Sequence, residues 1–168
     1  MSPQRNQLPF EAPHPPLQIV LIEPRIPPNA GNVARLCAAT GSTLHLVEPL
    51  GFKITDASLK RAGLDYWDSV KVVFHPDWTT FLETVPNHEK LWFFTTRAHI
   101  PHTEVTFAPG DYLVFGSETE GLPQTLLDRH PGRCCGIPIL LDHVRSLNLA
   151  TTVGIATYEA LRQLNKEL

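Results

Sequence analysis

The sequence predicts an α/β fold, a mostly parallel β-sheet with flanking helices. Short apolar runs recur along the chain, and each has the length of a strand that is buried on both faces. Segments that carry helix-start and helix-stop residues separate these runs. Because strands and helices take turns in this way, the strands are expected to pair in parallel.

Six segments have strand character, being short and rich in β-branched, leucine or aromatic residues. In chain order they are Leu17–Ile22, Thr43–Val47, Ser69–Phe74, Leu91–Thr95, Tyr112–Phe115 and Cys134–Ile139. The carboxyl ends of parallel strands meet at one edge of a sheet, so a ligand is expected at the loops that follow them.

Helices are predicted between these strands from their end signals. Prolines at positions 24, 27 and 28 stop the first strand, and the helix after it has Asn29 near its N-cap and ends at Gly41. The other predicted helices are Ala57–Ala62, a helix capped by Asp77 that runs to about Thr84, Pro123–Asp128, and a long helix over about Asn148–Leu164. The start of this last helix is apolar except for its threonines, which indicates burial in a core or an interface.

Length and composition indicate one globular domain. The chain has 168 residues, of which 42% are hydrophobic and 18% charged, an ordinary balance. Residues 1–16 contain five prolines and are expected to form a flexible or extended arm, which leaves residues 17–168 as a single domain. Because neither a membrane span of roughly 20 apolar residues nor a signal peptide is recognisable, a cytosolic protein is expected.

The net charge and the spacing of possible metal ligands limit which classes of function fit the sequence. The formal net charge of −3 argues against a strongly basic nucleic-acid binder, although local patches can act within an acidic whole. The three cysteines, Cys37, Cys134 and Cys135, form no disulfide framework and lack zinc-ligand spacing. His99 and His102 form an H-x-x-H pair without a second pair, so no metal is predicted.

The loop after the first strand carries Asn29-Ala-Gly-Asn-Val-Ala-Arg35. Gly31 permits a close backbone approach. Asn32 and Arg35 are three residues apart, so both can point from one face of a helix. An exposed arginine and two amides at this edge suit a phosphate or a ribose. The alternative is a capped helix with a surface arginine, which the pattern alone slightly favours.

Two later loops have similar character. Phe115 to Pro123 contains two glycines around a polar turn with Glu118, which allows backbone groups to face a ligand; the alternative is an ordinary turn with a surface acid. Further on, Ile137-Pro138 is followed by Arg145-Ser146-Leu147-Asn148. Ser146 or Asn148 is a reasonable helix N-cap, a role that is compatible with ligand binding.

Signatures of other nucleotide- or ester-handling α/β proteins are absent from the sequence. No G-x-G-x-x-G follows the first strand, so a dinucleotide-binding fold is unsupported. The phosphate-binding loop G-x-x-x-x-G-K-[ST] and the nucleophile elbow G-x-S-x-G are missing as well, which argues against an NTPase and an α/β-hydrolase.

Taken together, N-x-G-N-x-x-R, F-G-x-E-x-x-G-L-P and I-P…R-S-L-N-L-A resemble the three signature motifs of the SpoU branch of the SPOUT methyltransferases. The order and spacing agree, and the resemblance runs from Leu17 to about Leu164. The strings I-E-P-R-I-P-P-N-A-G-N, L-H-L-V-E-P-L-G-F, R-A-G-L-D-Y-W and Y-E-A-L-R-Q resemble those of the single-domain tRNA wobble-position (cytidine/uridine) 2′-O-methyltransferases.

The resemblance implies 2′-O-methylation of tRNA with S-adenosylmethionine, a C-terminal trefoil knot and a homodimer. It implies that the cofactor lies in the knot, held mainly by backbone. The residues expected beside its adenosyl part are Phe94, Thr95, Gly116, Ile137, Ser146 and Leu147. Between Ile137-Pro138 and Arg145-Ser146 the chain is one residue longer than the family pattern, so the resemblance assigns no role to the side chains at 141–144.

The resemblance also assigns roles to polar residues. Those expected in the catalytic site are Asn32, Arg35, Glu118 and Asn148, and those expected to bind RNA are Lys60, Arg61, Arg145 and Tyr158. The family assigns Arg35 a role in deprotonating the hydroxyl. Because a guanidinium stays protonated at ordinary pH, we favour a role in holding a phosphate and stabilising the developing alkoxide. The sequence leaves both open, with Glu118 as a weak candidate base.

Other assignments remain open at this level. The aromatic residues Phe52, Tyr66 and Trp67 lie near Lys53, Lys60 and Arg61 in the sequence and can stack on RNA bases, or else form core or dimer contacts. The substrate can instead be ribosomal RNA or another tRNA position. A non-catalytic RNA-binding protein on the same scaffold and a small-molecule methyltransferase are the remaining alternatives.

Overall fold

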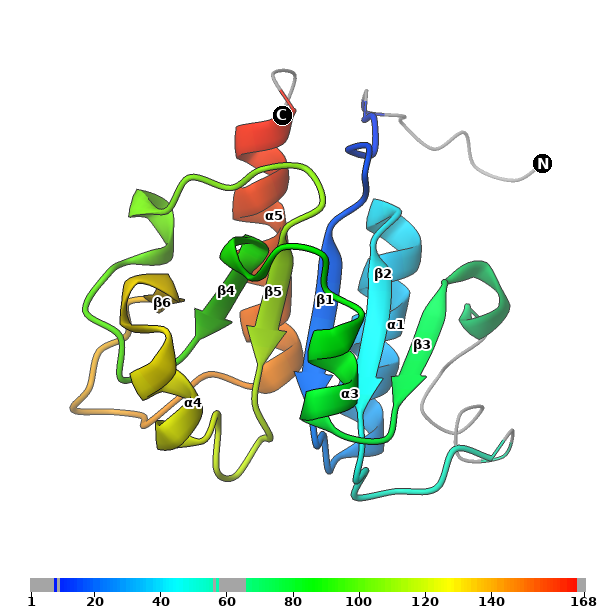
Figure 1. Ribbon diagram of the computed structural model, residues 1–168, viewed down its shortest axis with the longest axis horizontal. Helices are drawn as coiled ribbons and strands as arrows, with labels where there is room; N and C mark the ends of the chain where they lie inside the picture. Colours follow the sequence, from blue (N-terminus) through cyan, green and yellow to red (C-terminus); the bar gives the residue numbers. More distant parts are fainter. Residues whose placement is uncertain (1–7, 9, 56, 58–65, 166–168) are drawn as a thin grey trace.

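The computed structural model describes residues 8, 10–55, 57 and 66–165 (Figure 1). In this part of the chain, six parallel strands form one sheet in the order β3-β2-β1-β5-β4-β6. The strands are β1 (Gln18–Ile22), β2 (Thr43–Val47), β3 (Val72–His75), β4 (Leu91–Phe94), β5 (Tyr112–Phe115) and β6 (Cys134–Cys135). The helices are α1 (Pro27–Thr40), α3 (Trp78–Glu83), α4 (Gln124–Arg129) and α5 (Leu149–Leu164), with single 3₁₀ turns η1 (Trp67–Ser69), η2 (His88–Lys90), η3 (His102–Glu104) and η4 (Pro131–Arg133).

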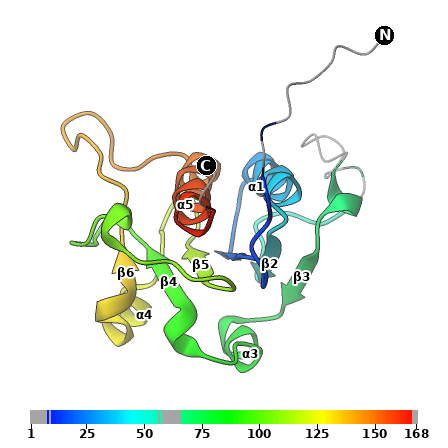
Figure 2. The same ribbon diagram turned by 90° about the horizontal axis from the view of Figure 1, so that it is seen from above.

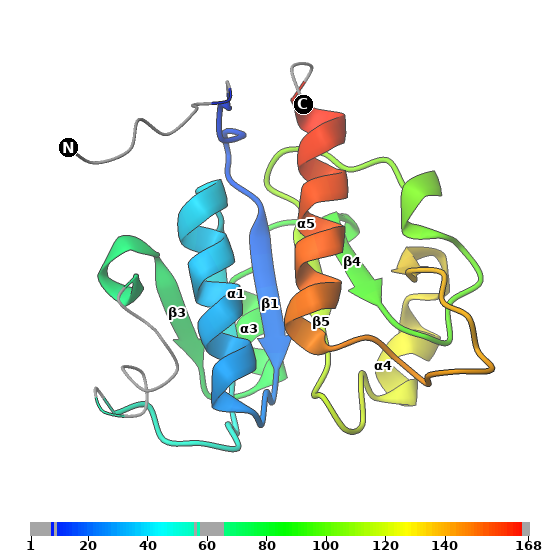
Figure 3. The ribbon, with the colours of Figure 1, turned by 180° about the vertical axis from the view of Figure 1, so that it is seen from behind.

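The helices cover both faces of the sheet. Figures 2 and 3 show α1 and α5 side by side on one face, with α3 and α4 on the other. In β1, Ile19 belongs to the core beneath α1 and α5, and its neighbour Val20 belongs to the core that holds Phe81 of α3. Because both faces are buried, the middle strands need apolar side chains at nearly every position, as their sequences predict. The α/β fold with a parallel sheet and flanking helices is confirmed.

Several predicted element boundaries are confirmed. Strands β2 and β5 have the predicted limits. Gly41 ends α1 with a φ of 68°, a left-handed conformation that glycine adopts without steric cost. Asp77 caps α3 by accepting a hydrogen bond from the Thr80 amide (2.7 Å). Asn148 caps α5, whose first residue is Leu149.

Other boundaries differ from the predictions. Helix α1 begins at Pro27 after the N-cap Ile26, so Asn29 lies near the N-cap, as predicted, and inside the first turn. Pro27 and Pro28 lead the helix because the first helical positions need no amide proton. The segment predicted as strand Ser69–Phe74 divides into η1 and β3, and the last strand ends at Cys135 rather than Ile139. The predicted helix Ala57–Ala62 lies outside the described residues except for Ala57.

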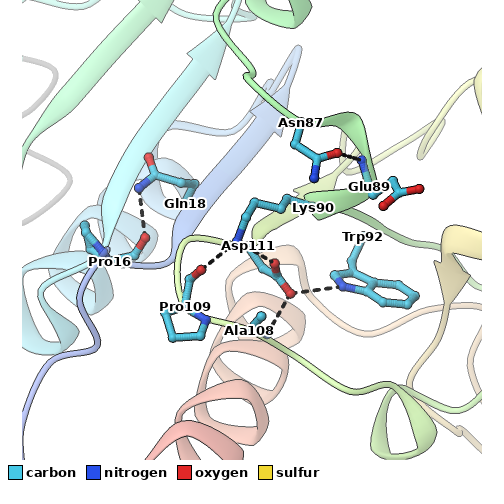
Figure 4. Close-up of polar contacts among 9 residues, drawn as sticks. All are labelled: Pro16, Gln18, Asn87, Glu89, Lys90, Trp92, Ala108, Pro109 and Asp111. Carbon is cyan, nitrogen blue, oxygen red and sulfur yellow. Dashed lines mark hydrogen bonds and ion pairs between the residues drawn. The ribbon is translucent and has the colours of Figure 1, made fainter.

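A buried carboxylate ties the amino ends of the central strands together (Figure 4). Asp111, just before β5, accepts hydrogen bonds from the Ala108 amide (2.8 Å) and from Trp92 Nε1 of β4 (3.2 Å). Lys90 Nζ lies 3.7 Å from its other oxygen. Burial raises the pKa of Asp111, and these partners oppose that rise. The cluster lies at the edge of the sheet opposite to the loops of interest.

No helix in the described part of the chain is long and apolar enough to cross a membrane. No group of three or more histidine, cysteine or acidic side chains there is arranged to hold a metal ion. Of the H-x-x-H pair, His102 is buried while His99 is exposed, so the two rings occupy different environments.

Candidate active site at the carboxyl ends of the strands

The three loops singled out in the sequence meet at one edge of the sheet. The carboxyl ends of β1 and β5 lie at the same end of the molecule as the first turns of α1 and α5 (Figure 3). Glu118, in the loop after β5, accepts hydrogen bonds from the amides of Arg25 (2.8 Å) and Ile26 (3.0 Å), which precede α1. These bonds satisfy amide groups at the entry to α1 that lack helical partners, so the carboxylate joins the first and second loops.

Asn29 connects all three loops. Its side-chain Nδ2 donates to Glu118 Oε1 (3.2 Å), and its Oδ1 accepts a hydrogen bond from Asn148 Nδ2 (3.0 Å). Asn29 is buried, so these partners fix the orientation of its amide. Asn148 Oδ1 in turn accepts a hydrogen bond from the Thr151 amide (3.2 Å). Asn148 therefore caps α5 and contacts the site at once.

The same contacts determine the charge state of Glu118. Burial raises its pKa, but hydrogen bonds from the amides of Arg25, Glu118 itself and Ile26 and from the Asn29 side chain outweigh burial and lower it overall. Glu118 is therefore an ionised acceptor at neutral pH. A carboxylate whose oxygens are already engaged, and whose pKa is low, is poorly suited to remove a proton from a hydroxyl group. This geometry argues against Glu118 as a base.

A cavity of about 330 Å³ lies beside this network. Its walls come from the ends of β4 and β5, the loop after β5, and the segment that leads from β6 into α5. All six residues predicted beside the cofactor line it, namely Phe94, Thr95, Gly116, Ile137, Ser146 and Leu147. Glu118 and Arg145 line it as well. The structure thus brings together residues that are far apart in the sequence.

Gly116 determines the shape of one wall. A Cβ atom at this position would lie 2.1 Å from the carbonyl carbon of Gly121, because the loop folds back on itself there. The Gly121 amide donates to the Ser117 carbonyl (3.0 Å), and Gly121 has a φ of 66°. The first glycine thus permits a backbone-to-backbone approach and the second a left-handed turn. The loop presents peptide groups at the cavity, as its composition predicted.

Arg97 is a residue of the cavity that the sequence analysis missed. It follows β4, and its guanidinium donates to the Leu122 carbonyl and to Gln124 Oε1 (2.6 Å). Through these bonds it joins the loop after β4 to the start of α4. No motif marks Arg97, because its partners are a backbone oxygen and a neutral amide; only the folded chain brings them within reach.

The remaining predicted residues do not line the cavity. Asn32 and Arg35 are exposed on α1, and the Arg35 guanidinium carbon lies 5.1 Å from the centre of the Tyr66 ring. Tyr158 is exposed on α5, ten residues beyond Asn148, or roughly 15 Å along the helix. Lys60 and Arg61 lie outside the described residues.

Comparisons with known proteins agree with this arrangement. The model of the SpoU rRNA Methylase family matches residues 16–158. A relative from Escherichia coli (strain K12), named tRNA (cytidine(34)-2′-O)-methyltransferase, is 48% identical over 149 residues, which cover 88% of this chain and 94% of the relative. A solved structure described as structural insights into the 2-OH methylation of C/U34 on tRNA shares 48% identity and a TM-score of 0.84, covering 89% of this chain and 97% of the other.

A more distant structure shares the fold alone. The AdoMet-bound rRNA methyltransferase from Sinorhizobium meliloti is 23% identical, with a TM-score of 0.72, and the match covers 88% of this chain and 56% of that one. The family match spans most of the chain, and the Escherichia coli relative matches at high identity over nearly its full length. The chain belongs to the SpoU rRNA Methylase family.

Proposed function

We propose that this protein is a tRNA (cytidine/uridine) 2′-O-methyltransferase that transfers a methyl group from S-adenosylmethionine to the ribose of nucleotide 34, the wobble nucleotide. The observation that carries the proposal is the match, over nearly the whole of both chains, to a relative named for this reaction. The hydrogen-bonded frame of Asn29, Glu118 and Asn148 supports it, because it is built from the three motifs that led to the family.

The cavity fits S-adenosylmethionine by size and chemistry. Its volume of about 330 Å³ lies within the range of small-molecule sites. Apolar side chains such as Leu122, Ile137 and Leu147 suit a purine, while peptide groups near Gly116 suit the polar parts of a nucleoside. S-adenosylmethionine supplies an electrophilic methyl group on a sulfonium, so the protein has mainly to align it with the ribose. No metal ion enters this chemistry.

The polar residues of the site have two separate roles, which are to position the loops and to contact the RNA. Glu118, Asn29 and Asn148 hold the loops in register, and α1, the helix of Asn29, also carries Asn32 and Arg35. Arg35 donates hydrogen bonds to an RNA phosphate and to the 2′-oxygen as negative charge develops on it. A guanidinium is suited to this role because it keeps its charge and presents five N–H donors in a plane.

The proposed RNA surface is local and basic. Arg145 lines the cavity, and Lys60, Arg61 and Tyr158 complete the set by resemblance to the family. A flipped-out anticodon-loop nucleotide enters the cavity while these side chains hold the flanking backbone. Because Tyr158 is remote from the cavity of its own chain, it serves the site of a second copy or a distant part of the tRNA.

Larger-scale features of the family belong to the same proposal. The protein forms a homodimer through the outer side of α1 and α5, where Ile155 and Tyr158 are exposed. Its C-terminal part forms a trefoil knot, as the resemblance to the family implies. Residues 17–168 form one cytosolic methyltransferase domain, and the arm predicted for residues 1–16 lies in large part outside the described residues.

The test is methyl transfer from labelled S-adenosylmethionine to total tRNA that lacks wobble methylation, with wild type and Arg35→Ala compared. We expect a 2′-O-methyl group at nucleotide 34 with wild type, mapped by nuclease digestion and mass spectrometry, and loss of about 100-fold or more with the variant. Labelling of ribosomal RNA alone would retain the chemistry and overturn the substrate. Cofactor binding without labelling of any RNA would favour a non-catalytic RNA-binding protein.

A further inference from the structure

The contact between Arg35 and Tyr66 joins two parts of the sequence that no motif connects. Arg35 is in the middle of α1, and Tyr66 precedes η1. The guanidinium carbon lies 5.1 Å from the centre of the tyrosine ring, within the range of a cation–π interaction. Both residues are exposed, and among the described residues Arg35 has no hydrogen bond or ion pair. The ring is therefore its one recorded partner there.

A ring is a particular kind of partner for a catalytic arginine. An ion pair would occupy N–H donors and neutralise the charge that the reaction requires. The face of an aromatic ring attracts the cation through its quadrupole and leaves the donors at the rim of the guanidinium available. Tyr66 can therefore restrict the rotamers of Arg35 without consuming the groups that a phosphate or a 2′-oxygen would need.

The backbone of Tyr66 is itself held in place. The Tyr66 carbonyl accepts a hydrogen bond from the Ser69 amide (2.9 Å), which closes the turn of η1. The next residue, Trp67, packs against the core, and its ring lies 6.3 Å from that of Phe74 on β3. The tyrosine thus stands on a short turn anchored to the sheet, opposite the exposed side of α1.

We propose that Tyr66 is a positioning residue that holds the Arg35 guanidinium over its ring, in the orientation that methyl transfer requires. The inference rests on the proposed function. The competing role for Tyr66 is stacking on an RNA base. The two roles differ in a measurable way. A stacking residue contributes to tRNA binding, while a positioning residue contributes to the rate of methyl transfer in the bound complex.

The kinetic test compares Tyr66→Leu, which removes the aromatic face, with Tyr66→Phe, which keeps it. We expect Tyr66→Leu to lower kcat by about threefold to tenfold with KM for tRNA unchanged, and Tyr66→Phe to stay within about twofold of wild type. Thr79→Ala, at an exposed position on α3, is the control and should keep both constants. A rise in KM with kcat unchanged would overturn the proposal in favour of base stacking.

A second readout does not depend on activity. In NMR spectra, the Arg35 side-chain protons should show an upfield ring-current shift in wild type and Tyr66→Phe, lost in Tyr66→Leu. Unchanged S-adenosylhomocysteine affinity and unchanged Tm would show that the variants are folded. Equal Arg35 shifts in all three proteins would overturn the positioning role. If the shift behaves as expected but wild type methylates no tRNA, the contact stands and the proposed function fails.

Discussion

Asn29 is the residue on which the geometry of the site depends. Its side-chain amide donates a hydrogen bond to Glu118 and accepts one from Asn148, so it needs a donor on one side and an acceptor on the other. An aspartate would place a second carboxylate against Glu118, and an alanine would leave Asn148 Nδ2 without its protein acceptor. The position therefore requires an amide, which is why a buried polar side chain occurs in the first turn of an otherwise apolar helix face.

We expect Asn29→Ala to lower the free energy of unfolding by about 1–3 kcal/mol, because Glu118 and Asn148 each lose a hydrogen bond to the Asn29 side chain. Asn29→Asp should cost more at pH 7, because two carboxylates then face each other. Urea denaturation measures both changes. Asn32→Ala, exposed on the same helix, is the control and should change stability by less than about 0.5 kcal/mol. Equal stability of wild type and Asn29→Ala would contradict the bridging role.

At the scale of single residues, the sequence predicted the residues that line the cavity better than the hydrogen bonds that join Asn29, Glu118 and Asn148. The predicted cofactor residues line the cavity because backbone loops at strand ends keep their place whenever the fold is kept. Arg97 and the role of Asn29 were missed, since both depend on partners from other loops. Glu118 was considered as a weak candidate base; its hydrogen bonds to backbone amides, which no sequence pattern reveals, argue against that role.

Among the elements, the central strands were easier to predict than the edge strands. Strands β2 and β5 are paired on both sides and packed on both faces, so their limits coincide with their apolar runs. Strands β3 and β6 pair on one side only, and each is shorter than its apolar segment. Chain geometry at an edge is set by the neighbouring turns rather than by burial alone, which the apolar pattern does not report.

A buried pair of histidines links β2 to the edge strand β3. Gln18 Nε2 donates to the Pro16 carbonyl (2.9 Å), which leaves its Oε1 to accept from His45 Nε2 (2.7 Å). His45 Nδ1 must then accept from His75 Nε2 (2.9 Å). This chain of bonds needs neutral His45. Burial, together with the positive charges that His75 and Lys71 can carry, lowers its pKa from 6.5 to about 4.

This pair predicts a loss of stability in mild acid. The unfolded chain takes up a proton on His45 below pH 6.5, and the folded chain does so only below about pH 4, so stability falls as pH drops through that window. We expect a loss of about 2 kcal/mol between pH 7.5 and pH 5, measured by urea denaturation. The double variant His45→Phe/His75→Phe should flatten this profile, while the exposed-site control His99→Asn should keep it. If the free energy of unfolding of wild type did not change between pH 7.5 and pH 5, the folded protein would not require a neutral His45.

For the whole molecule, the main question is how a chain with a negative net charge could engage tRNA, its proposed substrate. The cavity lies at one end of the sheet, whereas Tyr158 lies far along α5. The outer side of α1 and α5 exposes Ile155 and Tyr158 close to the helix that carries Arg35. A second copy packed on this side would bury the apolar side chain and combine basic residues of two chains into one surface, which offsets a net charge of −3.

The proposed dimer would make assembly a condition for activity. We expect wild type to sediment as a dimer and Ile155→Glu to sediment as a monomer, because a buried unpaired charge opposes association. The variant should lose tRNA methylation while keeping its affinity for S-adenosylhomocysteine within about twofold, since Ile155 does not line the cavity. Thr125→Glu, exposed on α4 across the sheet, is the matched control and should remain an active dimer. A fully active monomeric wild type would show that each chain carries a complete site, and Tyr158 would then have to act on RNA outside the cavity.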